Sequence, residues 1–137
     1  MKKRFFIIFV LFFNSLFVLA QRDELPQNLR KIYEGQWIIR RKHYINTIEI
    51  KFEKGKNYAT LIDIGTGEAP PIELQANIKN NILIIPARLH KNDYIEMEVK
   101  NQKLIFRTQP AIWSGAGKSL PPDRKNLIIT TFKRVKK

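Results

Sequence analysis

The chain has 137 residues, of which 25 are basic and 12 acidic, so its formal net charge at pH 7 is +13, and it contains no cysteine. This length suits one domain. The lack of thiols excludes disulfide bonds, thiolate metal sites and lipid attachment at a cysteine. The fold must therefore be held by a well-packed core or a closed sheet.

The first twenty residues have the layout of a secretory signal peptide. A cationic start at residues 1–4 precedes an apolar run that ends at Ala20, and Val18 and Ala20 supply the small residues of a cleavage site. The run is shorter than the roughly 20 residues that cross a bilayer, which favours cleavage over a retained anchor. We expect an exported protein, periplasmic or secreted, that is cleaved after Ala20 and whose mature chain spans 21–137.

Residues 23–35 are predicted to form a short helix. Pro26 suits the first turn, and Gly35 suits a helix end. Three apolar residues recur at helical spacing, namely Leu25, Leu29 and Ile32.

From Gln36 onward the apolar residues recur with a period of two, which is typical of antiparallel strands with one buried and one wet face. Ile48, Ile50 and Phe52, for example, alternate with polar or charged residues. The pattern predicts eight strands, at about 36–42, 47–53, 57–64, 72–78, 82–86, 94–100, 103–108 and 127–134.

Short and long connections alternate strictly along these strands. The long ones are 43–46, 65–71, 87–93 and 109–126. In an up-and-down meander they all fall at one end, and the N-terminal helix lies at the other. We therefore predict an all-β, eight-stranded up-and-down antiparallel barrel, in a single domain over 21–137, with a short N-terminal helix as a plug. Such a barrel can hold one small ligand.

Gly35-Gln36-Trp37 follows the predicted helix, and Arg134 lies near the end of the last predicted strand. This arrangement resembles the Gly-x-Trp signature of the lipocalins and the wider calycin barrels. The resemblance implies that Trp37 closes the bottom of the barrel and that Arg134, or else Lys133, packs across its ring. The lipocalin Thr-Asp-Tyr motif and the long helix after the barrel are missing, so the chain is more similar to small lipocalin-like domains of bacterial envelopes.

Arg41 is the most specific candidate for ligand binding. If Trp37 points inward, strand alternation also places Ile39 and Arg41 inside the barrel. A buried arginine needs an anionic partner, which indicates an amphiphile with an acidic head. The alternative is that Arg41 belongs to a solvated run, Arg40-Arg41-Lys42.

The loops at the barrel mouth supply the other candidate ligand-binding residues, which are His43, Tyr44, Arg88 and Trp113. The 109–126 loop is longer than most loops in compact domains, and loops of that length are often functional or disordered. Its Trp113 is expected to fold over the mouth or to contact a partner. The alternative is a loop packed on the outside of the barrel.

No catalytic or metal-binding constellation is predicted. The two histidines, His43 and His90, are far apart without ligand spacing, and residues 115–119 lack the rest of a phosphate-loop motif. Glu96 and Glu98 share a strand face that reads as solvent-exposed. We expect a non-enzymatic monomer without metal or cofactor and, because the basic residues are scattered, without a nucleic-acid partner.

Two functions remain open from the sequence. The first is binding of a small hydrophobic or amphiphilic ligand in the barrel. The second is a protein-binding module, such as an envelope inhibitor of a protease or lysozyme, that acts through the long loops. The basic charge favours acidic partners or serves solubility alone. The barrel interior separates the two functions, since full packing favours the inhibitor.

Overall fold

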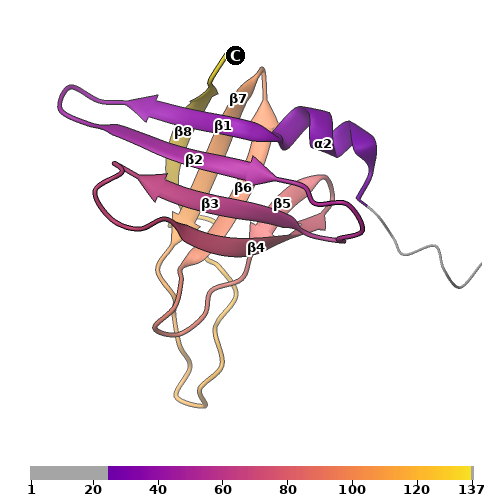
Figure 1. Ribbon diagram of the computed structural model, residues 1–137. Coiled ribbons are helices and arrows are strands. Elements are labelled where there is room, and N and C mark those ends of the chain that lie inside the picture. The colour runs from indigo at the N-terminus through magenta and orange to yellow at the C-terminus, as the bar shows by residue number, and fades with distance from the viewer. Residues whose placement is uncertain (1–24, 137) are drawn as a thin grey trace, which may run out of the picture.

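The computed structural model describes residues 25–136, which form a closed eight-stranded antiparallel barrel and one short helix (Figure 1). The strands are β1 (Gly35–Arg40), β2 (Ile45–Lys51), β3 (Ala59–Gly65), β4 (Ile72–Lys79), β5 (Ile82–Ile85), β6 (Tyr94–Lys100), β7 (Lys103–Gln109) and β8 (Ile128–Arg134). The predicted all-β barrel is confirmed, and each strand lies within two residues of its predicted bounds. The predicted signal peptide over 1–20 lies outside the described residues.

Helix α2 (Gln27–Tyr33) is shorter than the helix predicted over 23–35. Pro26 does not lie in the first turn but immediately precedes the helix, and its carbonyl accepts a hydrogen bond from the Leu29 N–H at 3.0 Å. The helix ends at Tyr33 because Glu34 is already extended. Gly35 then opens β1 with φ at +125°, a backbone conformation that only glycine adopts readily.

The buried face of α2 is carried by Leu29 and Tyr33, which are 3% and 2% exposed. These residues are four positions apart, so they lie above one another on the same helix face. Ile32, which the apolar spacing grouped with Leu29, is instead 41% exposed. The helix therefore contacts the barrel through one leucine and one tyrosine, and Tyr33 was not among the residues singled out from the sequence.

The barrel has two dissimilar ends. The closed end carries α2 and the turns at 52–58, 80–81 and 101–102, and the open end carries the connections 41–44, 66–71, 86–93 and 110–127. Paired residues in an antiparallel ladder share a face, and Trp37 pairs with Ile48 as Ile50 pairs with Leu61. The inward side chains toward the closed end are fully buried, among them Trp37, Ile48, Ile50, Leu61, Leu83, Met97 and Leu104.

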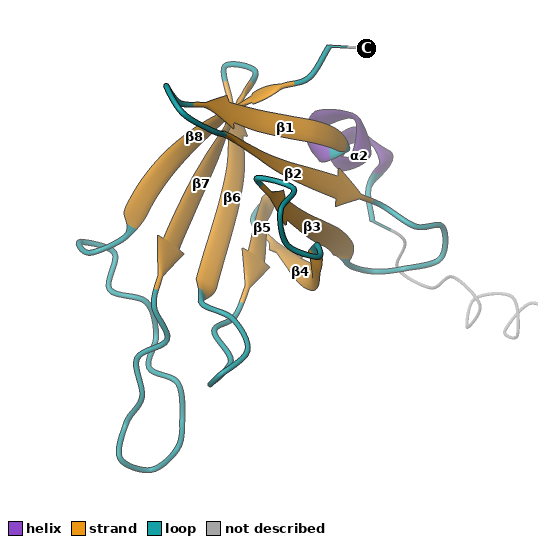
Figure 2. Cartoon of the chain, turned by 60° about the vertical axis from the view of Figure 1, so that its left-hand side comes forward, coloured by secondary structure: helices purple, strands orange, loops and turns teal. Residues whose placement is uncertain are grey.

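Three of the eight strand ladders are short, with three residue pairs or fewer, namely β1–β8, β4–β5 and β5–β6. β1 and β8 pair only through Trp37 with Arg134 and Ile38 with Lys133, and β4 and β5 pair only from Asn77 to Lys79. The β1–β8 and β4–β5 ladders both lie toward the closed end. The barrel therefore divides into two half-sheets, β1–β4 and β5–β8, which are joined near the closed end and cross one another steeply (Figures 1 and 2).

Candidate binding site at the open end of the barrel

The closed end is sealed around Trp37. Its indole Nε1 donates a hydrogen bond to the Tyr33 carbonyl at 2.8 Å, and the whole residue is 0% exposed. The guanidinium carbon of Arg134 lies 4.5 Å from the ring centroid, within cation–π distance. Arg134 also donates hydrogen bonds to the carbonyls of Glu34, at 2.9 Å, and of Ile32. One arginine thus covers the tryptophan and satisfies carbonyls at the C-terminus of α2, which intrahelical bonds leave free.

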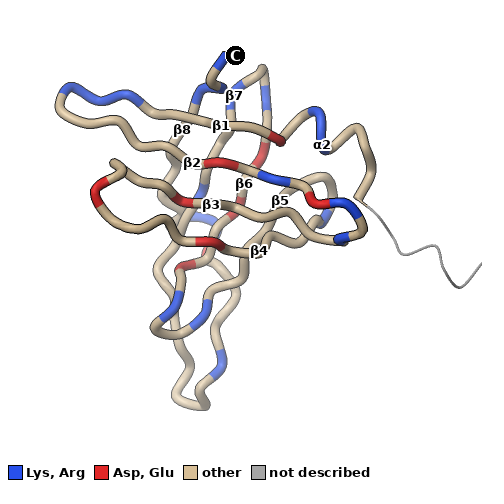
Figure 3. Tube along the Cα trace, viewed as in Figure 1, with Lys and Arg blue, Asp and Glu red and all other residues tan. Residues whose placement is uncertain are grey.

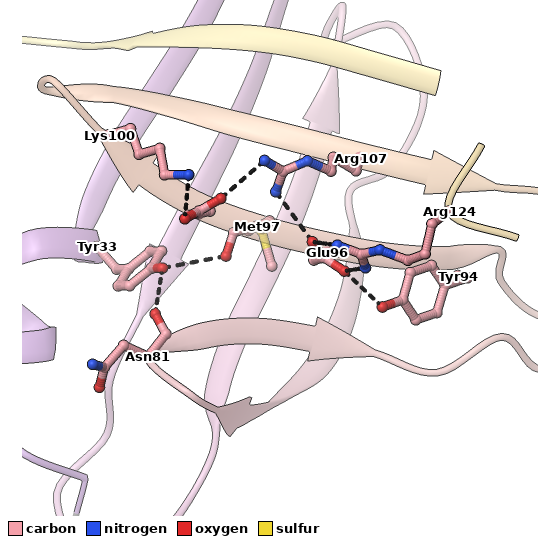
Figure 4. A network of polar contacts seen from close by, with 9 residues as sticks. Tyr33, Asn81, Tyr94, Glu96, Met97, Lys100, Arg107 and Arg124 are labelled. Carbon is pink, nitrogen blue, oxygen red and sulfur yellow. Dashed lines mark hydrogen bonds and ion pairs between the residues drawn. The ribbon is translucent and has the colours of Figure 1, made fainter. Parts of the chain in front are cut away.

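Tyr33 holds α2 against the barrel from the other side. Its hydroxyl lies 2.8 Å from the carbonyl oxygen of Asn81, in the β4–β5 turn, and 3.2 Å from that of Met97 in β6 (Figure 4). Burial raises the pKa of this hydroxyl above its ordinary value. These contacts and the packed side chains above them fill the barrel interior at the closed end, and a hollow of about 180 Å³ lies between α2 and the β4–β5 turn.

Toward the open end, inward-facing side chains are no longer fully covered. On the β1–β4 half, Leu74 and Ile39 are half-buried, and Ile72 is 57% exposed. On the β5–β8 half, Phe106 is half-buried against Phe132, with ring centroids 5.5 Å apart, and Ile128 is 59% exposed. The open end therefore presents apolar side chains on the barrel's inner face without the neighbours that would remove them from water.

Asn46 adds an unsatisfied polar atom to this inner face. It pairs with Ile39 in the β1–β2 ladder, so its side chain lies on the inward side. Its Oδ1 is buried and accepts no hydrogen bond within the described part of the chain. A buried acceptor without a partner costs about 1–3 kcal/mol and is uncommon in native proteins. An atom of this kind suits a donor group supplied by a bound molecule, and the sequence reasoning did not single it out.

A hollow of about 220 Å³ opens at the place where the β4–β5 ladder ends. It is lined by Glu73, Leu74 and Gln75 from β4, Ile85 from β5, and Pro86, Arg88 and Asn92 from the connection that follows. Leu74 and Ile85 belong to the inner face of the barrel, since they pair with Leu61 and Ile95. The hollow thus reaches the inner face from the side, and its lining contains one cation, Arg88, and one carboxylate, Glu73. Its volume suits part of a small ligand, such as one alkyl chain.

Arg41 does not lie inside the barrel, so the interior position is wrong and the alternative, a solvated run over residues 40–42, is what the structure has. β1 ends at Arg40, and the chain turns at Arg41, whose N–H donates to the Tyr44 carbonyl at 2.9 Å. Strand alternation no longer applies beyond that point, and the side chain is exposed. Arg41, His43 and Tyr44 instead share an open hollow of about 580 Å³ with Thr66 and Glu68 of the β3–β4 connection.

Arg88 and Trp113 lie on the other half-sheet. Arg88 borders the 220 Å³ hollow and also a second hollow of about 340 Å³, which contains His90, Lys91 and Ala111. Trp113 is half-buried and forms an isolated β-bridge with Ser119 inside the long connection. The five residues predicted at the mouth therefore fall into two groups at the tips of diverging half-sheets (Figure 1).

The long connection between β7 and β8 is fixed to the outer face of β6 through Glu96 (Figure 4). This carboxylate accepts hydrogen bonds from Arg107 Nη1 at 3.1 Å, Arg124 Nη2 at 3.2 Å and the Tyr94 hydroxyl at 2.9 Å, and Arg124 Nη1 makes a further short contact. Glu96 is only 2% exposed, so the prediction of a solvated glutamate is wrong here. The connection that carries Arg124 covers it, and strand periodicity contains no information about that cover.

The charges around Glu96 determine its ionisation. Burial opposes the carboxylate form, but the hydrogen bonds from Arg124 and Tyr94 and the charges of Arg124 and Arg107 outweigh it, so the pKa of Glu96 lies below its ordinary value. Burial and the hydrogen bond to Glu96 raise the pKa of Tyr94 to about 12. Glu96 is therefore a permanently charged anchor at neutral pH.

Within residues 25–136, no group of three histidine, aspartate or glutamate side chains is arranged to hold a metal ion. Over the same residues, no helix has the length and apolar character needed to cross a membrane. A scan against models of known protein families matches none to this chain, and searches of curated proteins and of solved structures also return no match.

Proposed function

We propose that the protein is an exported, lipocalin-like, non-enzymatic carrier that binds a small hydrophobic or amphiphilic molecule between its two half-sheets at the open end. The observation that carries this proposal is the pair of interrupted ladders, β1–β8 and β4–β5. They leave apolar residues of the inner face, such as Ile72 and Ile128, more than half exposed. An apolar ligand seated there removes this surface from water, which is favourable by about 25 cal/mol per Å².

The polar groups near this surface favour an amphiphile over a plain hydrocarbon. Arg88 and Glu73 both line the hollow that reaches Leu74, so the arginine suits an acidic group of the ligand head and the glutamate a hydrogen-bond donor of it, while the tail follows the inner face. The unpaired Oδ1 of Asn46 suits a hydroxyl or amide hydrogen of the same ligand. The packed closed end limits how deep such a ligand enters. Because the open end is not packed to the same degree, a carrier is favoured over a protein-binding module.

Native mass spectrometry of residues 21–137 purified from their own envelope, beside a denatured control, tests this function. A small mass that leaves on denaturation is the expected result. Titration with a fluorescent long-chain fatty acid then measures the affinity, and variants of the open end locate the site.

Leu74→Asp should weaken fatty-acid binding by about tenfold or more, because it places a charge among apolar groups and repels the acidic head. Ile129→Asp is the matched control. Ile129 is 64% exposed and pairs with Arg107, on the outer face of the sheet, so its substitution should leave the affinity unchanged. A clean protein mass together with no fatty-acid binding, or equal losses in both variants, contradicts the proposal.

A further inference from the structure

Two loops of the β5–β8 half lie side by side at the open end and project beyond the strands (Figures 1 and 2). They are residues 86–93, between β5 and β6, and residues 110–120, the outer part of the connection between β7 and β8; together we call them the loop pair. Their proximity is also given by the 340 Å³ hollow, which is lined by Arg88 and His90 from one loop and by Ala111 from the other.

The longer loop is an ordered ribbon. The Leu120 N–H donates to the Ile112 carbonyl at 2.8 Å, and the Ser114 N–H donates to the Lys118 carbonyl at 3.0 Å. Trp113 and Ser119 form a β-bridge between these bonds. This pairing holds the tip in one shape.

The root of the longer loop is fixed as well. Arg124 binds the buried carboxylate of Glu96, and the Asp123 N–H donates to Gln109 Oε1 at 2.8 Å. A projecting loop with a fixed root loses little conformational freedom when it binds a partner.

Both loops expose large apolar side chains. Leu89 is 45% exposed, Ile112 41% and Leu120 47%, and the half-buried Trp113 lies next to Ile112. Each of these side chains is therefore partly in contact with water and is not packed into the barrel. Ile112 and Leu120 lie opposite each other on the ribbon, since the Leu120 N–H donates to the Ile112 carbonyl, and Leu89 belongs to the neighbouring loop.

Positive charge accompanies these apolar side chains on both loops. The loop pair contains three basic residues, Arg88, Lys91 and Lys118, and one acidic residue, Asp93 (Figure 3). No ion pair joins any of these four side chains to another group in the described part of the chain. Exposed apolar side chains beside unpaired cations are a combination by which peripheral proteins enter the interface of an anionic membrane, with tryptophan at the level of the head groups.

We propose that the loop pair is a docking surface for an anionic lipid bilayer. Leu89, Ile112 and Leu120 enter the head-group boundary, and the three cations contact lipid phosphates. This surface goes beyond the proposed carrier function and does not require a molecule in the barrel. It places the open end toward the membrane and the helix-capped end away from it.

Flotation with lipid vesicles tests the docking surface. The whole mature protein should bind vesicles of mixed phosphatidylglycerol and phosphatidylcholine and bind pure phosphatidylcholine weakly, with binding that falls as salt is added. Because Trp37 is fully buried, the shift of tryptophan emission on binding should come from Trp113 and should disappear in Trp113→Phe.

Two triple variants and their matched controls locate the surface. Leu89→Ser with Ile112→Ser and Leu120→Ser should lower binding to anionic vesicles about tenfold or more, and so should Arg88→Gln with Lys91→Gln and Lys118→Gln. The apolar control replaces Ile32, Ile45 and Ile129 by Ser, and the charge control replaces Lys54, Lys79 and Lys103 by Gln. All six control side chains belong to exposed residues away from the loop pair.

Absence of vesicle binding, or equal losses in the controls and the loop variants, would overturn the proposal. Capture of a protein in place of vesicles would do the same and would favour a protein partner. Fatty-acid binding measured on the same variants separates this result from the carrier function. Leu74→Asp should lose the fatty acid and keep the vesicles, whereas the apolar loop variant should do the reverse.

Discussion

At the closed end of the barrel the inward-facing side chains are fully buried, whereas at the open end side chains on the same face are partly uncovered. Trp37 is 0% exposed, but Ile72 and Ile128 are 57% and 59% exposed. Of the nine large hydrophobic residues found exposed between residues 25 and 136, eight lie toward the open end, and Ile32 on α2 is the ninth. The comparison separates a region that holds the fold together from a region whose apolar side chains are left uncovered.

The difference between the ends comes from pairing and not from composition, since isoleucine and leucine occur at both. Near the closed end all eight ladders are present, and α2 with Arg134 covers the interior. Toward the open end the β1–β8 and β4–β5 ladders have stopped, so each half-sheet keeps an apolar face without a partner.

Truncation of Trp37 should have the largest effect on the closed end. Trp37→Ala removes a fully buried indole, its hydrogen bond to Tyr33 and its contact with Arg134. We expect the free energy of unfolding to fall by about 3–5 kcal/mol, as for other large aromatic residues truncated in a core. Urea denaturation measures it. Trp113→Ala at the open end should cost less than about 1 kcal/mol, and similar losses in both variants would abolish the distinction between the ends.

Loss of the Glu96 charge should have an intermediate effect. Glu96→Gln keeps the side-chain size but weakens the bonds to Arg107 and Arg124, so we expect a loss of about 2 kcal/mol at neutral pH. Proteolysis within 110–120 should also become faster as the root of the loop is released. Unchanged unfolding and unchanged proteolysis would show that Glu96 does not anchor the loop.

The dependence of stability on acid pH should test whether Glu96 is charged in the folded protein. The folded pKa values of Glu96 and Glu98 are lowered, so both carboxylates stabilise the fold above their ordinary pKa of 4.5. That stability is lost as the pH falls through the lower folded values. The free energy of unfolding, measured from pH 6 downward, should fall more steeply in the wild type than in Glu96→Gln. Parallel curves would contradict a lowered pKa at Glu96.

Arg134→Met should destabilise the closed end by about 1 kcal/mol. Methionine keeps apolar contact with Trp37 but loses the cation–π contact and the hydrogen bonds to the carbonyls of Ile32 and Glu34. Lys133→Met, one position earlier on β8, is the matched control and should be close to neutral. Thermal unfolding distinguishes the two variants, and equal melting temperatures would show that Arg134 does not stabilise the closed end.

Asn46→Leu should give the smallest change and the opposite sign. It removes the buried unsatisfied Oδ1 and should raise the free energy of unfolding by up to about 1 kcal/mol. The same substitution should weaken an amphiphile that donates a hydrogen bond and spare a plain hydrocarbon. A loss of stability would indicate that Asn46 has a structural role, and the open end would then lack this polar contact.

Much of the barrel was predictable because strand alternation and turn lengths are local properties of the sequence. All eight strands follow from them, as does the common face of Trp37 and Ile39. β3 shows where the rule weakens, since Leu61 and Ile62 face opposite sides and are 0% and 8% exposed. There the pairing with Ile50 and Leu74 decides the inward face, and pairing is not a local property.

The candidate site was less predictable because it depends on where strands end and what covers them. Arg41 lies outside because β1 ends one residue before it. Glu96 is buried because Arg124, 28 positions later in the chain, lies over it. Asn46 had a usable signal, since it lies two positions before Ile48 on the inward alternation, but the lack of a partner for its Oδ1 is a property of the folded structure.

The short β1–β8 ladder also bears on the order of folding. Every other ladder joins strands that are adjacent in sequence and can form as a local hairpin, whereas Arg134 reaches Glu34 across 100 positions. The chain entropy lost on closing such a loop is recovered only when this last ladder and its tryptophan–arginine contact form. Closure is therefore expected late in the folding reaction. Substitutions at Arg134 should accelerate unfolding and leave the refolding rate nearly unchanged.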